Sequence, residues 1–191
     1  MDEFFAPGYR LLTPRVQLRR VEAADAAAQF ALHSDPAAMR YWSSAAWTTL
    51  EQAEQQIAQA GQEAERGSAL CLALVLRASG AVIGNVSLYA ISRAHRRCEL
   101  GYMLARSCHG QGLMAEAVRA VIGTAFGSGQ LERIGAEVDP RNTPSERLLV
   151  NTGFTREGYA LRRWIVNDEQ CDSILYGLLR DEWPSGSAGR P

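Results

Sequence analysis

Apolar residues recur along the chain with two periods, and these periods predict the order of its helices and strands. Residues 23–33 are rich in alanine and predict a first helix. Residues 50–64 carry apolar side chains at the i, i+3, i+4 spacing of one helical face and predict a second. Thr48, three residues before Glu51, matches the capping box that begins such a helix. Residues 112–126 predict a third helix, because their apolar positions also share one face.

A fourth helix is predicted from the signals at its two ends. Thr143 is the expected N-cap residue, Pro144 occupies the first helical position, and Glu146 is the acid of a capping box. Gly153 is expected at C′, where glycine tolerates the left-handed conformation. Phe154 is then expected to pack back on the last helical turn.

Strands are predicted where apolar residues form continuous runs or alternate with polar ones. Turn residues separate several of these segments, as at 78–80 and at Asn167-Asp168. The predicted strands are residues 15–20, 69–76, 82–91, 98–104, 134–138, 159–166 and 173–179. No repeat or long linker divides the chain, so we predict one mixed α+β domain over residues 1–183. A loose leader is expected before residue 15 and a disordered tail at 184–191.

Composition excludes several classes of protein. The 191 residues are 47% hydrophobic and 21% charged, as in ordinary globular proteins. A net charge of -1 offers no bulk attraction for nucleic acid or an anionic membrane. No apolar window approaches the roughly 18 residues of a spanning helix, and the acidic N-terminus does not match a signal peptide, so a cytoplasmic location is expected. The four cysteines and three histidines are scattered, and neither a metal site nor a disulfide framework is predicted.

The segment with the clearest chemistry runs from a predicted strand through a glycine-rich turn into the third helix. The turn is Gly110-Gln111-Gly112, and the helix follows it directly. Glycine lets the backbone approach a ligand closely, and the first N–H groups of a helix have no acceptor within it. The turn therefore predicts an anion cradle that could hold a pyrophosphate mainly with backbone groups.

Two alternatives use the same residues. Gly110-x-Gly112-x-x-Ala115 formally fits a dinucleotide-binding fingerprint. That fingerprint should begin at the strand end, whereas residues 105–109 intervene here, and its acidic residue should follow sooner than Glu137 does. A glycine-rich turn without a ligand is the other alternative. A Walker A loop is excluded because no G-x-x-x-x-G-K-[ST] run exists.

The order of motifs in this region resembles the GNAT acetyltransferases, and within them the RimJ/RimL branch. The resemblance covers roughly residues 10–183. It is carried by Glu99-Leu100-Gly101-Tyr102-Met103-Leu104, by His109-Gly110-Gln111-Gly112-Leu113-Met114-x-Glu116-Ala117, and by Asn142-x-x-Ser145-x-x-Leu148-Leu149 followed by Asn151-Thr152-Gly153-Phe154.

The resemblance implies both the fold and the donor. The fold would be the GNAT acyl-CoA N-acyltransferase fold, with a largely antiparallel sheet of about seven strands and about four flanking helices. Acetyl-CoA would be the co-substrate, with no metal. The backbone of Met103 and Leu104 would pair with its pantetheine arm, which requires two neighbouring strands to diverge.

The remaining donor residues are also implied by the resemblance. Backbone N–H groups of the loop would bind the pyrophosphate, and the loop comprises His109, Gly110, Gln111, Gly112, Leu113, Met114 and Ala115. His109 stands where the family usually has Arg or Gln, and Met114 where it has Gly or Ala. Both changes preserve the backbone donors. Asn142 and Ser145 would flank the pantetheine and the thioester.

Catalysis by direct transfer needs a base for the amine, and a carboxylate is the natural choice. Glu99 is the first candidate because it lies on the strand that leads to the donor site, and Glu137 is the second. Many family members place a tyrosine seven residues after the Asn, where this chain has Leu149. Ser145 or a water must then protonate the thiolate. An acyl-enzyme on Cys108 is an alternative that would need a histidine base and an orienting acid.

The acceptor site is predicted from aromatic residues. Tyr41, Trp42 and Trp47 lie between the first two helices, and Trp164 lies on a late strand. They suit an amine through apolar and cation–π contacts, while ordinary packing is the alternative for each. The resemblance implies a protein N-terminus as the acceptor. A small amine, a non-catalytic CoA-binding module, and a monomer or a homodimer all remain open.

Overall fold

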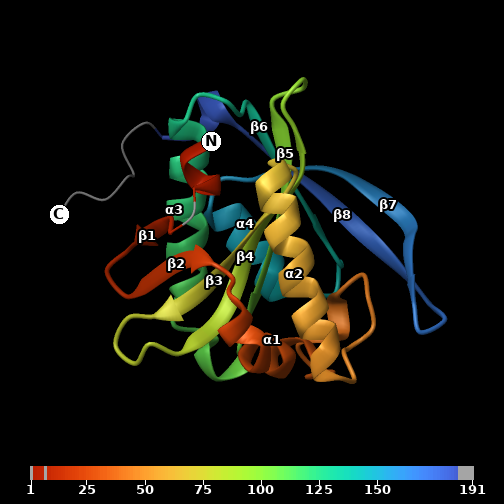
Figure 1. Cartoon of the computed structure of the whole chain (residues 1–191). Coiled ribbons are helices and arrows are strands. Elements are labelled where there is room, and N and C mark those ends of the chain that lie inside the picture. The colour runs from red at the N-terminus through yellow and green to blue at the C-terminus, as the bar shows by residue number, and fades with distance from the viewer. Residues whose placement is uncertain (1, 7, 185–191) are drawn as a thin grey trace.

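The computed structural model describes residues 2–6 and 8–184, and eight strands of this part of the chain form one sheet. Their spatial order is β1-β2-β3-β4-β5-β6-β8-β7, and every neighbouring pair is antiparallel except β5 with β6 (Figure 1). The strands are β1 Arg10–Leu12, β2 Val16–Arg20, β3 Leu70–Leu76, β4 Val82–Ser92, β5 Arg97–Leu104, β6 Arg133–Val138, β7 Thr155–Val166 and β8 Glu169–Leu179. The predicted mixed, largely antiparallel fold is confirmed.

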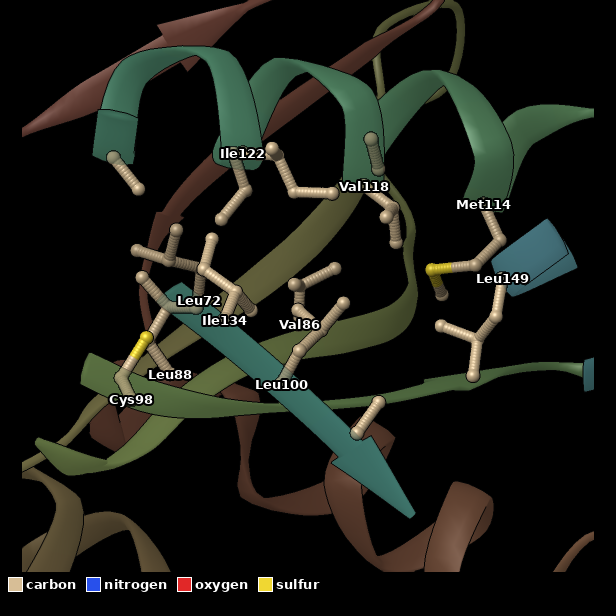
Figure 2. Close-up of a cluster of buried hydrophobic side chains, with 14 of the residues drawn as sticks. Leu72, Val86, Leu88, Cys98, Leu100, Met114, Val118, Ile122, Ile134 and Leu149 are labelled. Atoms are coloured by element: carbon tan, nitrogen blue, oxygen red, sulfur yellow. The ribbon is translucent and has the colours of Figure 1, made fainter. Parts of the chain in front are cut away.

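Two pairs of helices cover the two faces of the sheet. The helices are α1 Ala26–His33, α2 Leu50–Arg66, α3 Leu113–Gly127 and α4 Thr143–Asn151. Helices α1 and α2 contact each other and the strands β4 and β3, and Figure 1 shows α2 crossing in front of the sheet. On the other face, Val118 and Ile122 of α3 point down onto Leu100 of β5 and Ile134 of β6 (Figure 2).

The N-terminal leader departs from its prediction. Instead of a loose segment, residues 2–5 form a short 3-10 helix, and Phe4 is only 2% exposed in the main core. Its ring lies 4.9 Å from that of Tyr9. Strand β1, which follows, has three residues and is too short to show a hydrophobic period. The predicted tail is residues 184–191, and all of it except residue 184 lies outside the described part of the chain.

The helix caps are shifted by one residue from their predicted positions. The side-chain oxygen of Gln52 accepts hydrogen bonds from the N–H groups of Thr48 (2.7 Å) and Thr49 (3.0 Å). The capping pair of α2 is therefore Thr49 with Gln52, one position after the predicted pair. At α4 the N-cap is Asn142, whose side chain accepts from the N–H of Ser145 at 3.3 Å. Thr143 is already helical.

The end of α4 follows its prediction. Gly153 has a φ of 97°, in the left-handed region. The N–H of Phe154 donates to the carbonyl of Leu149 at 3.0 Å, and both side chains belong to the main core. Across the described ranges, no helix is long and apolar enough to cross a membrane.

Candidate active site

The site begins where two parallel strands separate. Strand β5 pairs with β6 only over residues 97–99 opposite 133–135. Beyond this point β5 continues to Leu104 and β6 to Val138 without pairing. In Figure 2 the two ribbons cross in projection near Leu100 and separate toward their carboxyl ends. The divergence that the family resemblance required is therefore present.

The free edge of β5 determines which backbone groups face the gap. The N–H of Ala105 donates to the carbonyl of Ile83 at 2.7 Å, which fixes the hydrogen-bonded register of β5 with β4. Backbone groups alternate between the two edges of a strand, so Met103 also faces β4, while Tyr102 and Leu104 face the gap. Of the two predicted pantetheine partners, only Leu104 has the required direction. The backbone of Tyr102 has the same direction as that of Leu104, whereas the backbone of Met103 faces β4, and pairing with pantetheine stays a prediction.

The glycine-rich turn has the geometry of an anion cradle. Gly110 and Gly112 have φ values of 74° and 73°, which glycine adopts without strain. The first intrahelical bond of α3 runs from the N–H of Glu116 to the carbonyl of Gly112 at 3.1 Å. The N–H groups of residues 113–115 therefore precede any helical acceptor and point out of the helix end. Because the side chains of Leu113 and Met114 are buried in the core, these residues offer only backbone to a ligand.

Side chains of the loop hold this backbone in place. The Nε2 atom of His109 lies 3.0 Å from the carbonyl oxygen of Leu104, which joins the loop to the end of β5. The side-chain amide of Gln111 donates to the carbonyl of Ser107 at 3.2 Å. The side chains of His109 and Gln111 thus have structural partners within the protein, and the prediction of an anion cradle rests on the backbone amides of the loop.

A second brace connects α3 to the turn between β1 and β2. The carboxylate of Glu116 accepts hydrogen bonds from the hydroxyl of Thr13 at 2.6 Å and from the Nε of Arg15 at 2.6 Å. Arg15 also donates to the carbonyl of Gln111 at 2.8 Å. The sequence contained no local signal for this brace, because its halves lie about a hundred positions apart.

A cavity of about 510 Å³ opens at the point where β5 and β6 separate. It brings together most of the predicted catalytic and acceptor residues from five different segments of the chain. Those lining it are Tyr41, Trp42, Glu99, Glu137, Asn142, Ser145 and Trp164. The glycine-rich turn at residues 110–112 does not line this cavity.

Trp47 does not line the cavity and has a packing role. Its ring stacks on that of His33, with centroids 4.1 Å apart and planes 14° apart. It also packs against a small core cluster that includes Ala53 and Ile57. Trp47 thus has a packing role beside helix α2, and its contact with the acceptor stays a prediction.

Glu99 is the least compensated carboxylate of the cavity. Its side chain is half-buried, and within residues 2–6 and 8–184 no hydrogen bond or ion pair engages it. Burial raises the pKa of Glu99, and the nearby charge of Glu137 raises it further. Gly135 on β6 makes room for it, since a Cβ there would lie 2.3 Å from a Glu99 oxygen.

Glu137 has a different environment in the same cavity. Both of its oxygens accept from the guanidinium of Arg163, at 2.8 and 3.1 Å. That guanidinium lies over the ring of Trp164, with 5.2 Å to the ring centroid. These two hydrogen bonds engage both carboxylate oxygens with which Glu137 would accept a proton.

A hydroxyl pair lies on the opposite wall. The Tyr102 and Ser145 hydroxyl oxygens are 2.7 Å apart and join β5 to the first turn of α4. Burial raises the pKa of Tyr102 to about 12, so the phenol keeps its proton at neutral pH. Sequence reasoning missed Tyr102 as a site residue, although it belongs to the strand motif that carried the resemblance. Across the described chain, no group of three or more His, Cys, Asp or Glu residues is arranged to hold a metal ion.

Comparison with known proteins defines the class of this site. The model of the acetyltransferase (GNAT) domain matches residues 15–155, and the chain belongs to this family. It is a GNAT-type N-acetyltransferase. It is 32% identical over 173 residues to the uncharacterized N-acetyltransferase p20 of Bacillus licheniformis, covering 91% of this chain and 97% of p20.

Two further matches lie in the RimJ/RimL branch. The [ribosomal protein uS5]-alanine N-acetyltransferase of Escherichia coli is 31% identical over 123 residues, or 64% of this chain and 63% of that protein. The structure of RimL, a ribosomal L7/L12 alpha-N-protein acetyltransferase in complex with coenzyme A, superposes with a TM-score of 0.83. It covers 91% of this chain and 99% of RimL, and its 20% identity supports the fold alone.

Proposed function

We propose that the protein transfers the acetyl group of acetyl-CoA to the α-amine of a protein or peptide N-terminus. The observation that carries this proposal is the carboxylate of Glu99, which lies at the apex of the strand divergence and has no hydrogen-bond or ion-pair partner among the described residues. A base is needed there because an amine must lose a proton to react. The donor and the acceptor would then meet in the 510 Å³ cavity.

The donor fits the edge of β5 that β6 leaves without strand pairing beyond Glu99. The N–H groups of residues 110–115 would bind the pyrophosphate, and the backbone of Tyr102 and Leu104 would pair with the pantetheine arm as an added strand pairs with a sheet edge. A Cβ on Gly110 would meet nothing within 4 Å, which leaves open space at the cradle. Asn142 and Ser145 would lie beside the thioester.

The reaction is a direct acyl transfer. The neutral amine attacks the thioester carbonyl, a C–N bond forms, and the C–S bond breaks with release of the coenzyme A thiolate. Glu99 takes the proton from the amine, directly or through a water. Its raised pKa brings it closer to neutral pH, where such a base works best. Glu137 is the weaker candidate because it is bound to Arg163.

The leaving thiolate can take its proton from the hydroxyl pair. Ser145 was the sequence candidate, and Tyr102 stands behind it at hydrogen-bonding distance, 2.7 Å. Ser145 would donate to the sulfur while accepting from the Tyr102 phenol, and bulk water would restore the proton. This arrangement fills the role that Leu149, 0% exposed in the core, cannot fill.

The charge of the cavity favours an acceptor with a single amine. Four acidic residues line it, but three have partners: Glu137 binds Arg163, Asp139 binds Arg141, and Asp172 accepts from the Tyr159 hydroxyl at 2.8 Å. A polyamine or an aminoglycoside would need several unpaired carboxylates. An α-amine also has a pKa near 8, against about 10.4 for lysine, so it is the easier amine to deprotonate. Tyr41, Trp42 and Trp164 would contact the residue that bears it.

The test is an acceptor screen with two readouts. Calorimetry measures coenzyme A binding, and thiol release from acetyl-CoA measures turnover against N-terminal peptides, an Nα-blocked lysine peptide, spermidine and kanamycin. The expected result is coenzyme A binding together with turnover of the free N-terminal peptides. Binding without release for any amine would favour a non-catalytic CoA-binding module. Preference for spermidine or kanamycin would overturn the peptide acceptor.

A further inference from the structure

Arg97 is a cation in the cavity wall that the proposed chemistry does not use. Its side chain is exposed, lines the cavity and, in the described part of the chain, takes part in no hydrogen bond or ion pair. The other arginine of the lining, Arg163, is bound to Glu137 by two hydrogen bonds. Arg133, which lies opposite Arg97 on β6, is bound to Glu157. Arg97 is therefore the guanidinium available to an anion from the cavity.

Arg97 and Glu99 are spaced to bind two opposite charges of one molecule. They lie two positions apart on β5, so their side chains leave the same face of the sheet. A strand rises about 3.3 Å per residue, which separates the two positions by roughly 6.6 Å. An amine bound at Glu99 would therefore have Arg97 one or two residue lengths away.

The neighbouring strand opens the cavity toward Arg97. Strand β4 is irregular between Tyr89 and Ser92, where Ala90 has a φ of 49° in the left-handed region. A β-bulge of this kind interrupts the pairing of the two strands and changes the direction of the side chains beside it. Tyr89 and Ala90 both line the cavity, and Ser92 is the β4 residue opposite Arg97. The approach to Arg97 is thus part of the cavity rather than a separate surface.

We propose that Arg97 determines acceptor specificity by binding an anionic group that the acceptor carries beside its amine. This inference depends on the proposed function, because it assigns the amine to Glu99. For a peptide acceptor, the anion is an acidic side chain at the second or third residue. A guanidinium binds a carboxylate with paired, charge-assisted hydrogen bonds, which a neutral amide cannot replace. The same chemistry would select a small amine that bears a carboxylate.

The experiment compares acceptors that differ only in this charge. Two peptide pairs carry Glu or Gln at the second or at the third residue, and a small pair is 6-aminohexanoate against hexylamine. We expect wild type to favour the anionic member of at least one pair by roughly tenfold in kcat/KM, the effect of one charged hydrogen bond. A preference in the peptide pairs identifies the peptide source, and one confined to the small pair identifies the small amine.

Three variants assign the preference to Arg97. Arg97→Gln should abolish this preference, because KM for the anionic acceptor should rise to that for the neutral one, and Arg97→Lys should retain part of the preference. Arg96→Gln is the matched control: it removes the same charge from the neighbouring residue, whose side chain binds Glu132 at 2.5 Å and does not line the cavity. Coenzyme A affinity, measured by calorimetry, should be the same in all.

Two outcomes would overturn the inference while leaving acetyl transfer intact. One is a wild-type enzyme that acetylates both members of every pair equally. The other is an anion preference that survives in Arg97→Gln. Failure of the wild-type protein to release thiol with any amine is a different result, because it would overturn the proposed function itself.

Discussion

The hydroxyl oxygens of Tyr102 on β5 and Ser145 in the first turn of α4 lie 2.7 Å apart. Each residue comes from an element that the donor site needs, the free edge of β5 and the first turn of α4. Burial keeps the Tyr102 phenol protonated by raising its pKa to about 12. In the proposed reaction this pair donates the proton that the leaving thiolate takes up.

Replacing Tyr102 with Phe should slow acetyl transfer without weakening amine binding. We expect kcat to fall by about 10²-fold, the lower end of the effect of a positioned acid, and KM for the amine to stay unchanged. The lost hydrogen bond should lower the free energy of unfolding by about 1 kcal/mol. Steady-state kinetics and urea unfolding measure the two effects.

A double-mutant cycle tests whether the two hydroxyls act together. If they do, Ser145→Ala and Tyr102→Phe should lower kcat by less in combination than the product of their separate effects. Effects that simply multiply would show that the hydroxyls act independently, and would contradict a shared proton path.

Glu99→Gln should remove the base and change the pH dependence of the rate. We expect kcat/KM to fall by roughly 10²- to 10⁴-fold at neutral pH. Because the pKa of Glu99 is raised by burial and by Glu137, the wild-type rate should decline, as pH falls, at a higher pH than the ordinary glutamate value of about 4.3. Below that decline the carboxyl is protonated and cannot accept a proton from the amine.

The control for Glu99 is a surface glutamate. Glu132→Gln removes the same charge from a residue that binds Arg96 and Arg180 and does not line the cavity. It should retain the wild-type rate and the acid limb of its pH profile. Undiminished turnover in Glu99→Gln, or an unchanged acid limb in its remaining activity, would exclude Glu99 as the base.

Gly110→Ala should weaken coenzyme A binding more than it destabilises the protein. A Cβ at φ 74° strains the backbone by about 1–2 kcal/mol. Gly80→Ala is a matched control, because Gly80 has a φ of 73°, also has nothing within 4 Å of an added Cβ, and lies in the turn between β3 and β4. Both variants should lose similar free energy of unfolding, but only Gly110→Ala should raise the Kd for coenzyme A, by about tenfold or more. Equal Kd values in the two variants would show that the turn does not contact the ligand.

Local patterns predicted the elements of this fold well, and their limits are physical. The period of apolar residues identified α2 and α3, because a buried helical face repeats within the segment itself. The cap of α2 was misplaced by one residue because Thr48 with Glu51 and Thr49 with Gln52 satisfy the same spacing. Only the hydrogen bonds of Gln52 distinguish them.

The site was harder to predict, because its side chains meet from distant segments. Glu99 and Glu137 looked equivalent as strand carboxylates, and only the contact of Glu137 with Arg163 separates them. Trp47 and Trp42 lie in one aromatic segment, yet one stacks on His33 while the other lines the cavity. The alternating direction of backbone groups along β5 also separates two adjacent residues, because those of Tyr102 face the gap and those of Met103 face β4.

Glu116 should stabilise the protein in a pH-dependent way, because it fixes the start of α3 to the turn after β1. Burial opposes its charge, but hydrogen bonds from the Thr13 hydroxyl and from Arg15 outweigh this and hold the pKa of Glu116 below its ordinary value. A lowered pKa means that folding favours the carboxylate, so the stabilisation is present above the unfolded pKa and is lost as pH falls through the folded one. Glu116→Gln should therefore lower the free energy of unfolding by about 1–2 kcal/mol at pH 7.

Urea unfolding of wild type and Glu116→Gln measures this difference in the free energy of unfolding. The difference should narrow steadily below about pH 4.3, the ordinary pKa of glutamate. Glu146→Gln controls for the loss of a glutamate charge, because among the described residues Glu146 accepts only from the neutral Tyr176 hydroxyl, at 2.9 Å, and a glutamine oxygen can also accept there. If the difference in the free energy of unfolding between wild type and Glu116→Gln stays constant from pH 7 to pH 3, the charge of Glu116 does not hold the brace.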